Sequence, residues 1–358
     1  MELQTRVFGL DLMRATAIVL VVFWHTYREI TYLAPGFSLP LFLDGVDLFF
    51  VLSGYLIGGI LLGTLERPGL TWGQRLRGFW ARRFFRTLPN YYLFLLLNIG
   101  MALVGVREGL INTNALAYFA LLQNLWKPFS LFFWESWSLV VEVWFYIAFP
   151  LAVMLFMLMK VGARRSIALA CAVFIVLPFI FRFRMVPFLS SIHQMEIHVR
   201  EVAIMRMDTV AFGIVAALLH DRWPEAWYRV RWPAFVAGAL GVVAITWHYD
   251  LDHLRFTATW NFTLSAIAMS LLLPLMSAWQ AVPRWGGAIT QLSLLAYATY
   301  LIHLPLRKAL EPFYSPYAPW AGWLQLTAYW ASCLTLAWVV YQFYEKPMMD
   351  LRERFGKR

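Results

Sequence analysis

The sequence predicts an all-α integral membrane protein, a bundle of about ten transmembrane helices around a polar central chamber. Hydrophobic residues make up 61% of the chain and charged residues only 14%, and the mean hydropathy is +0.62. This composition is far from that of soluble globular domains. Apolar runs also recur along the whole length and leave no stretch long enough for a soluble domain. We therefore expect a single transmembrane domain over residues 1–358, with no appended soluble domain.

Ten apolar segments are candidates for the transmembrane helices, since a span needs about 20 residues of helix. They lie at 8–27, 45–65, 90–106, 137–159, 167–182, 202–219, 232–248, 259–278, 289–306 and 322–343. The first segment carries charge and lacks a small-residue cleavage site. We therefore expect it to stay as a helix rather than to be removed as a signal peptide.

The distribution of positive charge predicts the orientation of the bundle. With a cytoplasmic N-terminus, the inner loops and tails hold 19 of the 30 Lys and Arg residues, and the outer loops hold nine. Arg14 and Arg206 are expected inside the membrane. Positive charge is retained on the cytoplasmic side, so both termini, including the tail 344–358, are predicted to be cytoplasmic. The net charge of +10 thus reports topology, and no nucleic-acid partner is expected.

The most informative segment is the first apolar run, RVFGLDLMRATAIVLVVFWHTYR, which contains Asp11, Arg14 and His25. Ionisable groups inside a span are costly, and a functional role is the default interpretation. Eleven steps of about 100° bring Arg14 and His25 onto one helix face, roughly 16 Å apart along the axis. The run therefore predicts a polar seam, with a cation at one depth and a titratable base at another.

Four further predicted helices carry ionisable groups in their outer halves. These groups are Asp47, Glu142, Arg206, Asp208 and His303. Such groups are stable at that depth only if they face one another or water inside the bundle. We therefore expect one polar chamber that collects residues from five helices.

The segment 66–89 is the second unusual feature, because its arginines alternate with aromatic residues. It is predicted to form an amphipathic helix at the cytoplasmic interface. Two roles stay open for it. The arginines can bind anionic lipid and fix the topology, or Arg82, Arg83 and Arg86 can recognise a phosphorylated small molecule.

At these residues the chain resembles the acyltransferase 3 family of integral membrane enzymes. The matching motifs are Arg14 followed after ten residues by His25, GVDLFFVLSGYLI (45–57), RRFFRTLPNYY (82–92), WSLVVEVWFY (137–146), RMDTVAFG (206–213), YATYLIH (297–303) and YEKP (344–347). The resemblance implies transfer of an acyl group, usually acetyl, from cytoplasmic acyl-CoA to a hydroxyl of an extracytoplasmic or lipid-linked glycan. Acetyl-CoA is then a donor substrate, and no permanently bound cofactor or metal is expected.

One departure from the family pattern concerns Glu142. The tryptophan motif commonly has two consecutive acids, and here Glu142 is followed by Val143. The chain also ends after the tenth segment, without the esterase-like domain that some larger relatives append. The bundle is therefore expected to complete the transfer alone or with a partner.

A sugar hydroxyl needs a base in the transition state, and His25 is the predicted general base or, in a variant, a covalent acyl carrier. Arg14 is expected to neutralise a phosphate or a developing oxyanion, or to pair with Asp11. Glu142 is expected to orient His25, to position the acceptor hydroxyl or to anchor the fold.

The other candidate residues fall into two groups. Donor binding is expected from Asp11, Arg82, Arg83 and Arg86, and acceptor binding or a satisfied polar core from Asp47, Arg206, Asp208 and His303. Gly54 and Gly58 predict a helix packing face of small residues. A glycolipid transporter or flippase that uses the same chamber is the main alternative, and the oligomeric state stays open.

Overall fold

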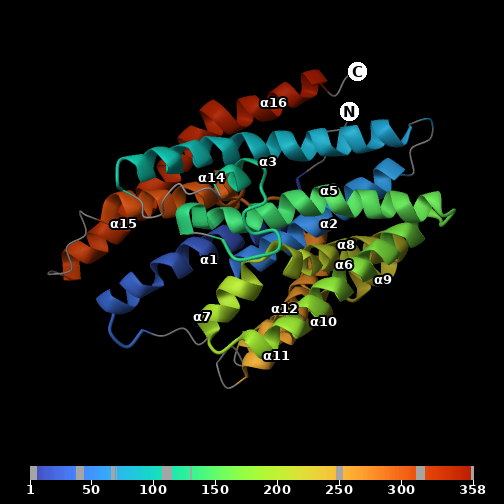
Figure 1. The fold of residues 1–358 in the computed structure, drawn as a ribbon, viewed down its shortest axis with the longest axis horizontal. Helices are drawn as coiled ribbons and strands as arrows, with labels where there is room; N and C mark the ends of the chain where they lie inside the picture. The colour runs from blue at the N-terminus through green and yellow to red at the C-terminus, as the bar shows by residue number, and fades with distance from the viewer. Residues whose placement is uncertain are drawn as a thin grey trace.

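The computed structural model contains helices and no strands in the part of the chain that it describes, and Figure 1 shows the helices gathered in one bundle. The described residues are 6–37, 44–65, 69, 71–106, 115–129, 131–246, 253–311 and 319–355. The predicted all-α class is confirmed for these residues.

The longer helices are α1 (Phe8–Leu33), α2 (Gly45–Leu65), α3 (Trp72–Leu103), α5 (Trp137–Leu158), α6 (Ala163–Met185), α8 (Met207–Arg222), α10 (Arg231–Thr246), α12 (Trp260–Ser270), α14 (Gly287–Leu310) and α15 (Pro319–Val340). The shorter helices are α4 (Ala115–Phe119), α7 (Ile192–Met195), α9 (Pro224–Arg229), α11 (Leu254–Ala258), α13 (Leu273–Ala278) and α16 (Lys346–Phe355). Three 3-10 turns cover Leu131–Ser136, Val186–Phe188 and Ala203–Met205, and π-helical turns cover Glu196–Arg200 and Tyr341–Glu345.

Seven helical stretches in the described part of the chain are long and apolar enough to cross a membrane. They are Phe8–Leu33, Gly45–Leu65, Phe132–Leu158, Ala163–Phe188, Trp260–Ala278, Gly287–Leu310 and Gly322–Leu351. The predicted segments 90–106, 202–219 and 232–248 correspond to the end of α3, to α8 and to α10, which fall short of that length or hydropathy. A multi-pass membrane protein is confirmed, and the count of ten spans stays a prediction.

Residues 72–89 of the basic segment and most of the third apolar segment lie in one helix, α3, rather than in two separate elements. A capping box starts it, in which Thr71 and Gln74 exchange side-chain and backbone hydrogen bonds. Pro89 lies inside the helix, where it removes one backbone donor. Tyrosine hydroxyls from neighbouring helices donate to the carbonyl oxygens of Thr87 and Pro89, at 2.7 and 3.1 Å. These two hydrogen bonds fasten α3 near Pro89 to tyrosines of α14 and of the π-helical turn Tyr341–Glu345.

Helices α2 and α8 pack with their backbones in direct contact. A Cβ on Gly54 would lie 2.0 Å from the carbonyl oxygen of Val210, and one on Gly213 would lie 2.1 Å from that of Val51. A Cβ on Gly58 would lie 2.6 Å from the Cβ of a facing alanine. The predicted packing face at Gly54 and Gly58 is therefore confirmed, because only glycine permits this approach.

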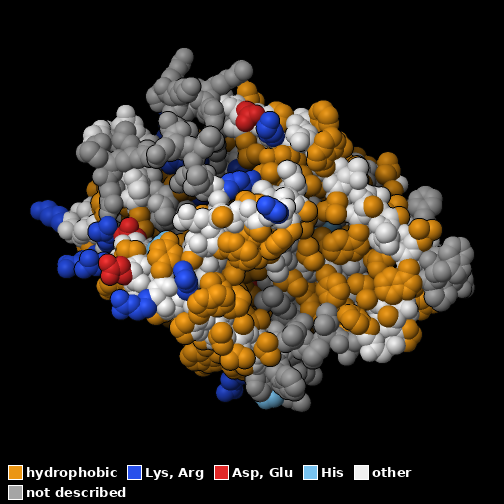
Figure 2. All heavy atoms as spheres, turned by 180° about the vertical axis from the view of Figure 1, so that it is seen from behind, with side chains coloured by type: hydrophobic (Ala, Val, Ile, Leu, Met, Phe, Trp, Pro, Cys, Tyr) orange, Lys and Arg blue, Asp and Glu red, His pale blue; other side chains and the backbone are white. Residues whose placement is uncertain are grey.

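The surface of the molecule matches a lipid environment. The face in Figure 2 is largely hydrophobic, with most of the visible Lys and Arg side chains towards one end. On α6, Leu169, Val176 and Phe183 are exposed by 44%, 51% and 56%. A helix of a soluble protein would turn such residues towards the core, so this face of α6 is suited to contact lipid tails.

Candidate active site

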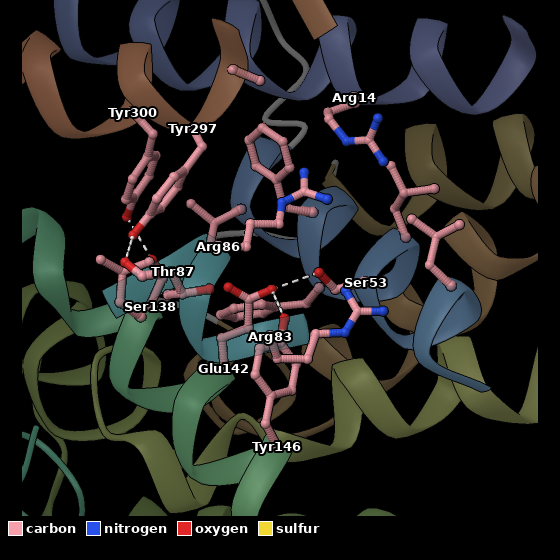
Figure 3. Close-up of a pocket in the computed structure, with 17 residues that line it drawn as sticks. Arg14, Ser53, Arg83, Arg86, Thr87, Ser138, Glu142, Tyr146, Tyr297 and Tyr300 are labelled. Atoms are coloured by element: carbon pink, nitrogen blue, oxygen red, sulfur yellow. Dashed lines mark hydrogen bonds between the residues drawn. The ribbon is translucent and has the colours of Figure 1, made fainter. Parts of the chain in front are cut away.

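Helices α1, α2, α3, α5 and α14 line a cavity of about 90 Å³ within the bundle, whose polar lining residues are labelled in Figure 3. A cavity of this size accommodates a few water-sized groups. It therefore fits the tip of a slender molecule but not a bulky nucleotide.

Glu142 lies on the wall of this cavity and accepts two hydrogen bonds at the same oxygen. Ser53 Oγ donates to Glu142 Oε1 at 2.6 Å, and the Tyr146 hydroxyl donates to the same atom. The guanidinium of Arg83 lies over the Tyr146 ring, 5.7 Å from its centre. Glu142 is thus held beside the arginines, and its hydrogen bonds come from α2 and α5 rather than from His25.

Three arginines line the cavity together with this single carboxylate: Arg14, Arg83 and Arg86. Within the described part of the chain, Arg83 and Arg86 form no ion pair, and Nε of Arg83 is buried without a hydrogen-bond partner. Arg82 is not among the lining residues. The wall therefore carries excess positive charge, which is suited to an anionic ligand.

Arg14 is anchored by an ion-pair network near the start of α1. Its Nη1 lies 3.1 Å from Asp11 Oδ1 and 3.0 Å from Ser293 Oγ. Asp11 also accepts two hydrogen bonds from Arg6, at 2.7 and 2.9 Å. The expected Arg14–Asp11 pair is therefore present, and it orients the guanidinium that reaches the cavity.

His25 lies outside the cavity lining and contacts a second histidine. Its Nδ1 lies 2.7 Å from the carbonyl oxygen of Val21, so the neutral ring carries its proton on Nδ1 and Nε2 is the basic nitrogen. The ring centres of His25 and His303 are 4.9 Å apart, and that of Trp134 lies 5.5 Å from His25. The ring of His25 thus contacts two other rings, with the tautomer that a general base requires.

Buried groups hold both neighbours of His25 in place. His303 Nδ1 lies 2.5 Å from the carbonyl oxygen of Tyr300. Trp134 Nε1 donates to Glu201 Oε1 at 2.6 Å. Burial raises the pKa of Glu201, although the hydrogen bond from Trp134 and the charge of Arg200 act to lower it.

The remaining predicted polar residues form two buried ion pairs. Arg206 pairs with Asp47, and the Arg206 guanidinium lies 3.9 Å from the centre of the Phe262 ring. Asp208 Oδ2 accepts from Arg182 Nη2 at 2.6 Å, and both side chains are fully buried. Arg182 also donates to a backbone carbonyl and to a threonine hydroxyl.

Sequence reasoning did not single out Arg182, which is the last residue of the predicted segment 167–182. The helical spacing of Arg182 relative to apolar residues of α6 could have identified it as a buried residue. Arg182 follows Ile167, Cys171 and Pro178 at intervals that put all four on one face of α6, and all four are buried.

The predicted single chamber is not confirmed in the described residues. The structure instead divides the candidates into the arginine-lined cavity with Glu142, the histidine pair, and the ion pairs of Asp47 and Asp208. Local burial and charge balance differ among the three groups, so their chemical capacities differ as well.

Comparison with known proteins assigns the class. A family model described as an acyltransferase domain, that of the acyltransferase 3 family, matches residues 7–342. Because this match covers nearly the whole chain, the protein belongs to the acyltransferase 3 family. No solved structure matches the chain.

Several relatives carry more particular names. A putative O-acetyltransferase of Staphylococcus aureus (strain COL) is 25% identical over 336 residues, 86% of this chain and 51% of the relative. The peptidoglycan O-acetyltransferase OatA of Listeria monocytogenes is 32% identical over 162 residues, 42% of this chain and 24% of OatA. The putative peptidoglycan O-acetyltransferase YrhL of Bacillus subtilis is 33% identical over 179 residues, 46% of this chain and 26% of YrhL. This chain spans about half the length of the staphylococcal relative and matches a smaller share of the other two.

Proposed function

We propose that this protein is a membrane O-acyltransferase that moves an acetyl group from cytoplasmic acetyl-CoA to a hydroxyl of a cell-envelope glycan. The observation that carries the proposal is a succession of sites along one helix. Arg14 on α1 reaches an electropositive cavity, and His25 lies about 16 Å further along the same helix with Nε2 as its basic nitrogen. The names of the relatives support acetyl as the acyl group and peptidoglycan as a candidate acceptor.

The cavity is our candidate for the donor site. Arg86 is exposed and Arg83 is buried beside it on α3, so together they offer guanidinium groups at the rim and in the wall. Guanidinium forks bind phosphate by charge-assisted hydrogen bonds. The phosphates of CoA would stay at these arginines, and the slender pantetheine arm would pass Arg14 towards His25.

The chemical step follows from the tautomer of His25. The acceptor oxygen attacks the thioester carbonyl carbon while its proton moves to His25 Nε2. The new C–O bond forms, the C–S bond breaks, and the CoA thiolate then takes the proton from the imidazolium. In this scheme Nδ1–H stays hydrogen-bonded to the Val21 carbonyl and holds the ring in place.

We propose that the donor site faces the cytoplasm. Figure 2 shows a group of Lys and Arg side chains at the end of the molecule where Figure 1 places the end of α2, the start of α3 and the end of α5. Positive charge is retained on the cytoplasmic side. We therefore propose cytoplasmic termini, ten spans and a bacterial inner-membrane location.

We assign Asp47, Arg206 and Asp208 to the fold rather than to acceptor binding. Each is buried and forms an ion pair with an oppositely charged side chain. We retain His303 as a candidate acceptor-binding residue, because its ring contacts that of His25.

Purified protein with labelled acetyl-CoA and a peptidoglycan acceptor tests the proposal. His25→Ala should lower transfer by about 10²- to 10⁴-fold while acetyl-CoA still binds. His193→Ala, at an exposed histidine on α7, is the matched control and should transfer normally. Normal transfer by His25→Ala would remove the assigned base. Absence of wild-type transfer, together with donor-independent glycolipid movement across liposomes, would favour a flippase.

A further inference from the structure

The cavity has a defined outer end, formed by Tyr300 of α14 and Ser138 of α5. Both line the cavity, and Figure 3 shows them on the side opposite Arg14. The order of lining residues along α5 agrees, because it runs from Ser138 at the start of the helix through Glu142 to Tyr146 beside Arg83. Tyr300 and Ser138 therefore lie at the end away from the arginines.

Hydrogen bonds fix the ring of Tyr300 at this position. Its hydroxyl donates to the carbonyl oxygen of Glu135 at 2.9 Å and shares a hydrogen bond with Ser138 Oγ at 2.7 Å. The side chain is buried, with 7% exposure. Two hydrogen bonds at one buried hydroxyl resist rotation of the ring, so Tyr300 forms a fixed wall.

The histidine pair lies directly beyond this wall. His303 follows Tyr300 by three residues on α14, and the two ring centres are 5.6 Å apart. Trp134, which contacts His25, precedes Ser138 by about one helical turn. Tyr300 and Ser138 therefore mark the end of the cavity that lies nearest the proposed base.

We propose that Tyr300 and Ser138 set the size of the acyl group that the enzyme accepts. The inference rests on the proposed function, in which the thioester enters from the arginine end with its acyl group foremost. An acetyl group ends in one methyl group beyond the carbonyl, whereas a butyryl chain needs space that the Tyr300 ring occupies. A pocket wall of this kind selects against each added methylene by about 10- to 200-fold.

The test compares acetyl-CoA with butyryl-CoA as donors for purified full-length protein. Tyr300→Ala opens the wall and should shift the kcat/KM ratio towards butyryl-CoA by at least ~10-fold. Tyr300→Phe keeps the ring and should leave the ratio nearly unchanged, even if its rate falls. Tyr92→Phe is the control, because the Tyr92 hydroxyl donates to the carbonyl oxygen of Phe119 outside the cavity.

An unchanged donor ratio in a folded, active Tyr300→Ala variant would overturn the inference and leave the proposed function intact. If that variant does not fold, Tyr300→Leu and Ser138→Gly open the wall less and should move the ratio in the same direction. If the wild type transfers no acetyl group, the proposed function fails. The relative affinities for the two donors then decide the inference, because equal affinities in the wild type contradict a size-selective wall.

Discussion

The arginines of the bundle occupy two regions, which differ in whether an acidic side chain compensates the positive charge. In one region, Arg182 and Arg206 are fully buried, and each pairs with an aspartate from another helix. In the other region, Arg83 and Arg86 line a cavity and form no ion pair with any described residue. The charges of the first region balance one another, whereas the wall of the second region carries excess positive charge.

This difference shows that buried charge alone does not identify a ligand site. A charge removed from water is stable only with a partner, and the protein supplies that partner in the first region. In the second region only Arg83 is buried, Arg86 is exposed to water, and a ligand can supply the partner. Both regions look alike in the sequence, since both consist of ionisable residues in apolar surroundings.

The largest expected effect comes from breaking a complete pair. Asp208→Asn leaves the fully buried guanidinium of Arg182 without its counter-ion. An uncompensated buried charge costs about 3 to 5 kcal/mol, so we expect a large loss of folded protein and of thermal stability in detergent.

Arg164→Gln is the matched control, because the Arg164 and Asp221 side chains are 51% and 31% exposed. Exposed pairs contribute at most about 1 kcal/mol, so this variant should unfold near the wild-type temperature. If both variants lost the same stability, the distinction between the two regions would not hold.

A smaller effect is expected from a substitution in α2, the helix that carries residues of both regions. Gly54 follows Ser53, which lines the cavity, and lies two turns beyond Asp47 of the paired region. Gly54→Ala forces α2 away from α8, and such overpacking costs about 1 to 3 kcal/mol. Stability and acetyl-CoA affinity should therefore fall together.

Gly59→Ala on the same helix is the control for this prediction, since no atom lies within 4 Å of a Cβ at that position. Thermal unfolding and donor titration of both variants are the measurements. A Gly54→Ala variant as stable as Gly59→Ala would contradict the observed closeness of the two backbones.

The sequence was sufficient to predict the features that depend on local pattern. Apolar length predicted the all-helical membrane class, helical periodicity placed Arg14 and His25 on one helix, and small-residue spacing located the face of Gly54 and Gly58. Each of these follows from residues a few positions apart, where the geometry of an α-helix is fixed.

The features that the sequence did not predict depend on partners far along the chain. Arg182 pairs across α6 and α8, and Tyr300 bonds to residues more than 160 positions away. The hydrogen bonds that tie α3 near Pro89 to tyrosines of α14 and of the turn Tyr341–Glu345 likewise join residues far apart in the chain. Packing selects these contacts, and no local spacing records them.

The smallest expected effect concerns Glu201, a buried carboxylate that accepts from an indole and forms no ion pair among the described residues. Burial raises the pKa of Glu201 in the folded state above its ordinary value of 4.5. The protonated carboxyl group therefore makes its full contribution to stability below pH 4.5. That contribution is lost as the pH rises through the folded value.

Glu201→Gln keeps an acceptor for Trp134 and removes the titration. Its melting temperature should therefore depend less on pH, between 4.5 and neutrality, than that of the wild type. Identical pH profiles for the two proteins would show that the burial of Glu201 has no energetic consequence.

The central claim is that Arg83 and Arg86, which form no ion pair among the described residues, bind a phosphorylated donor. Titration of acetyl-CoA onto purified protein tests it most directly. Arg83→Gln combined with Arg86→Gln should weaken binding by about 100-fold or more, since each charge-assisted hydrogen bond is worth about 1.5 to 3 kcal/mol. Arg77→Gln removes an exposed arginine of the same helix that does not line the cavity, and its affinity should stay near that of the wild type. Wild-type affinity in the double variant, or an equal loss in Arg77→Gln, would contradict the assignment of this cavity to the donor.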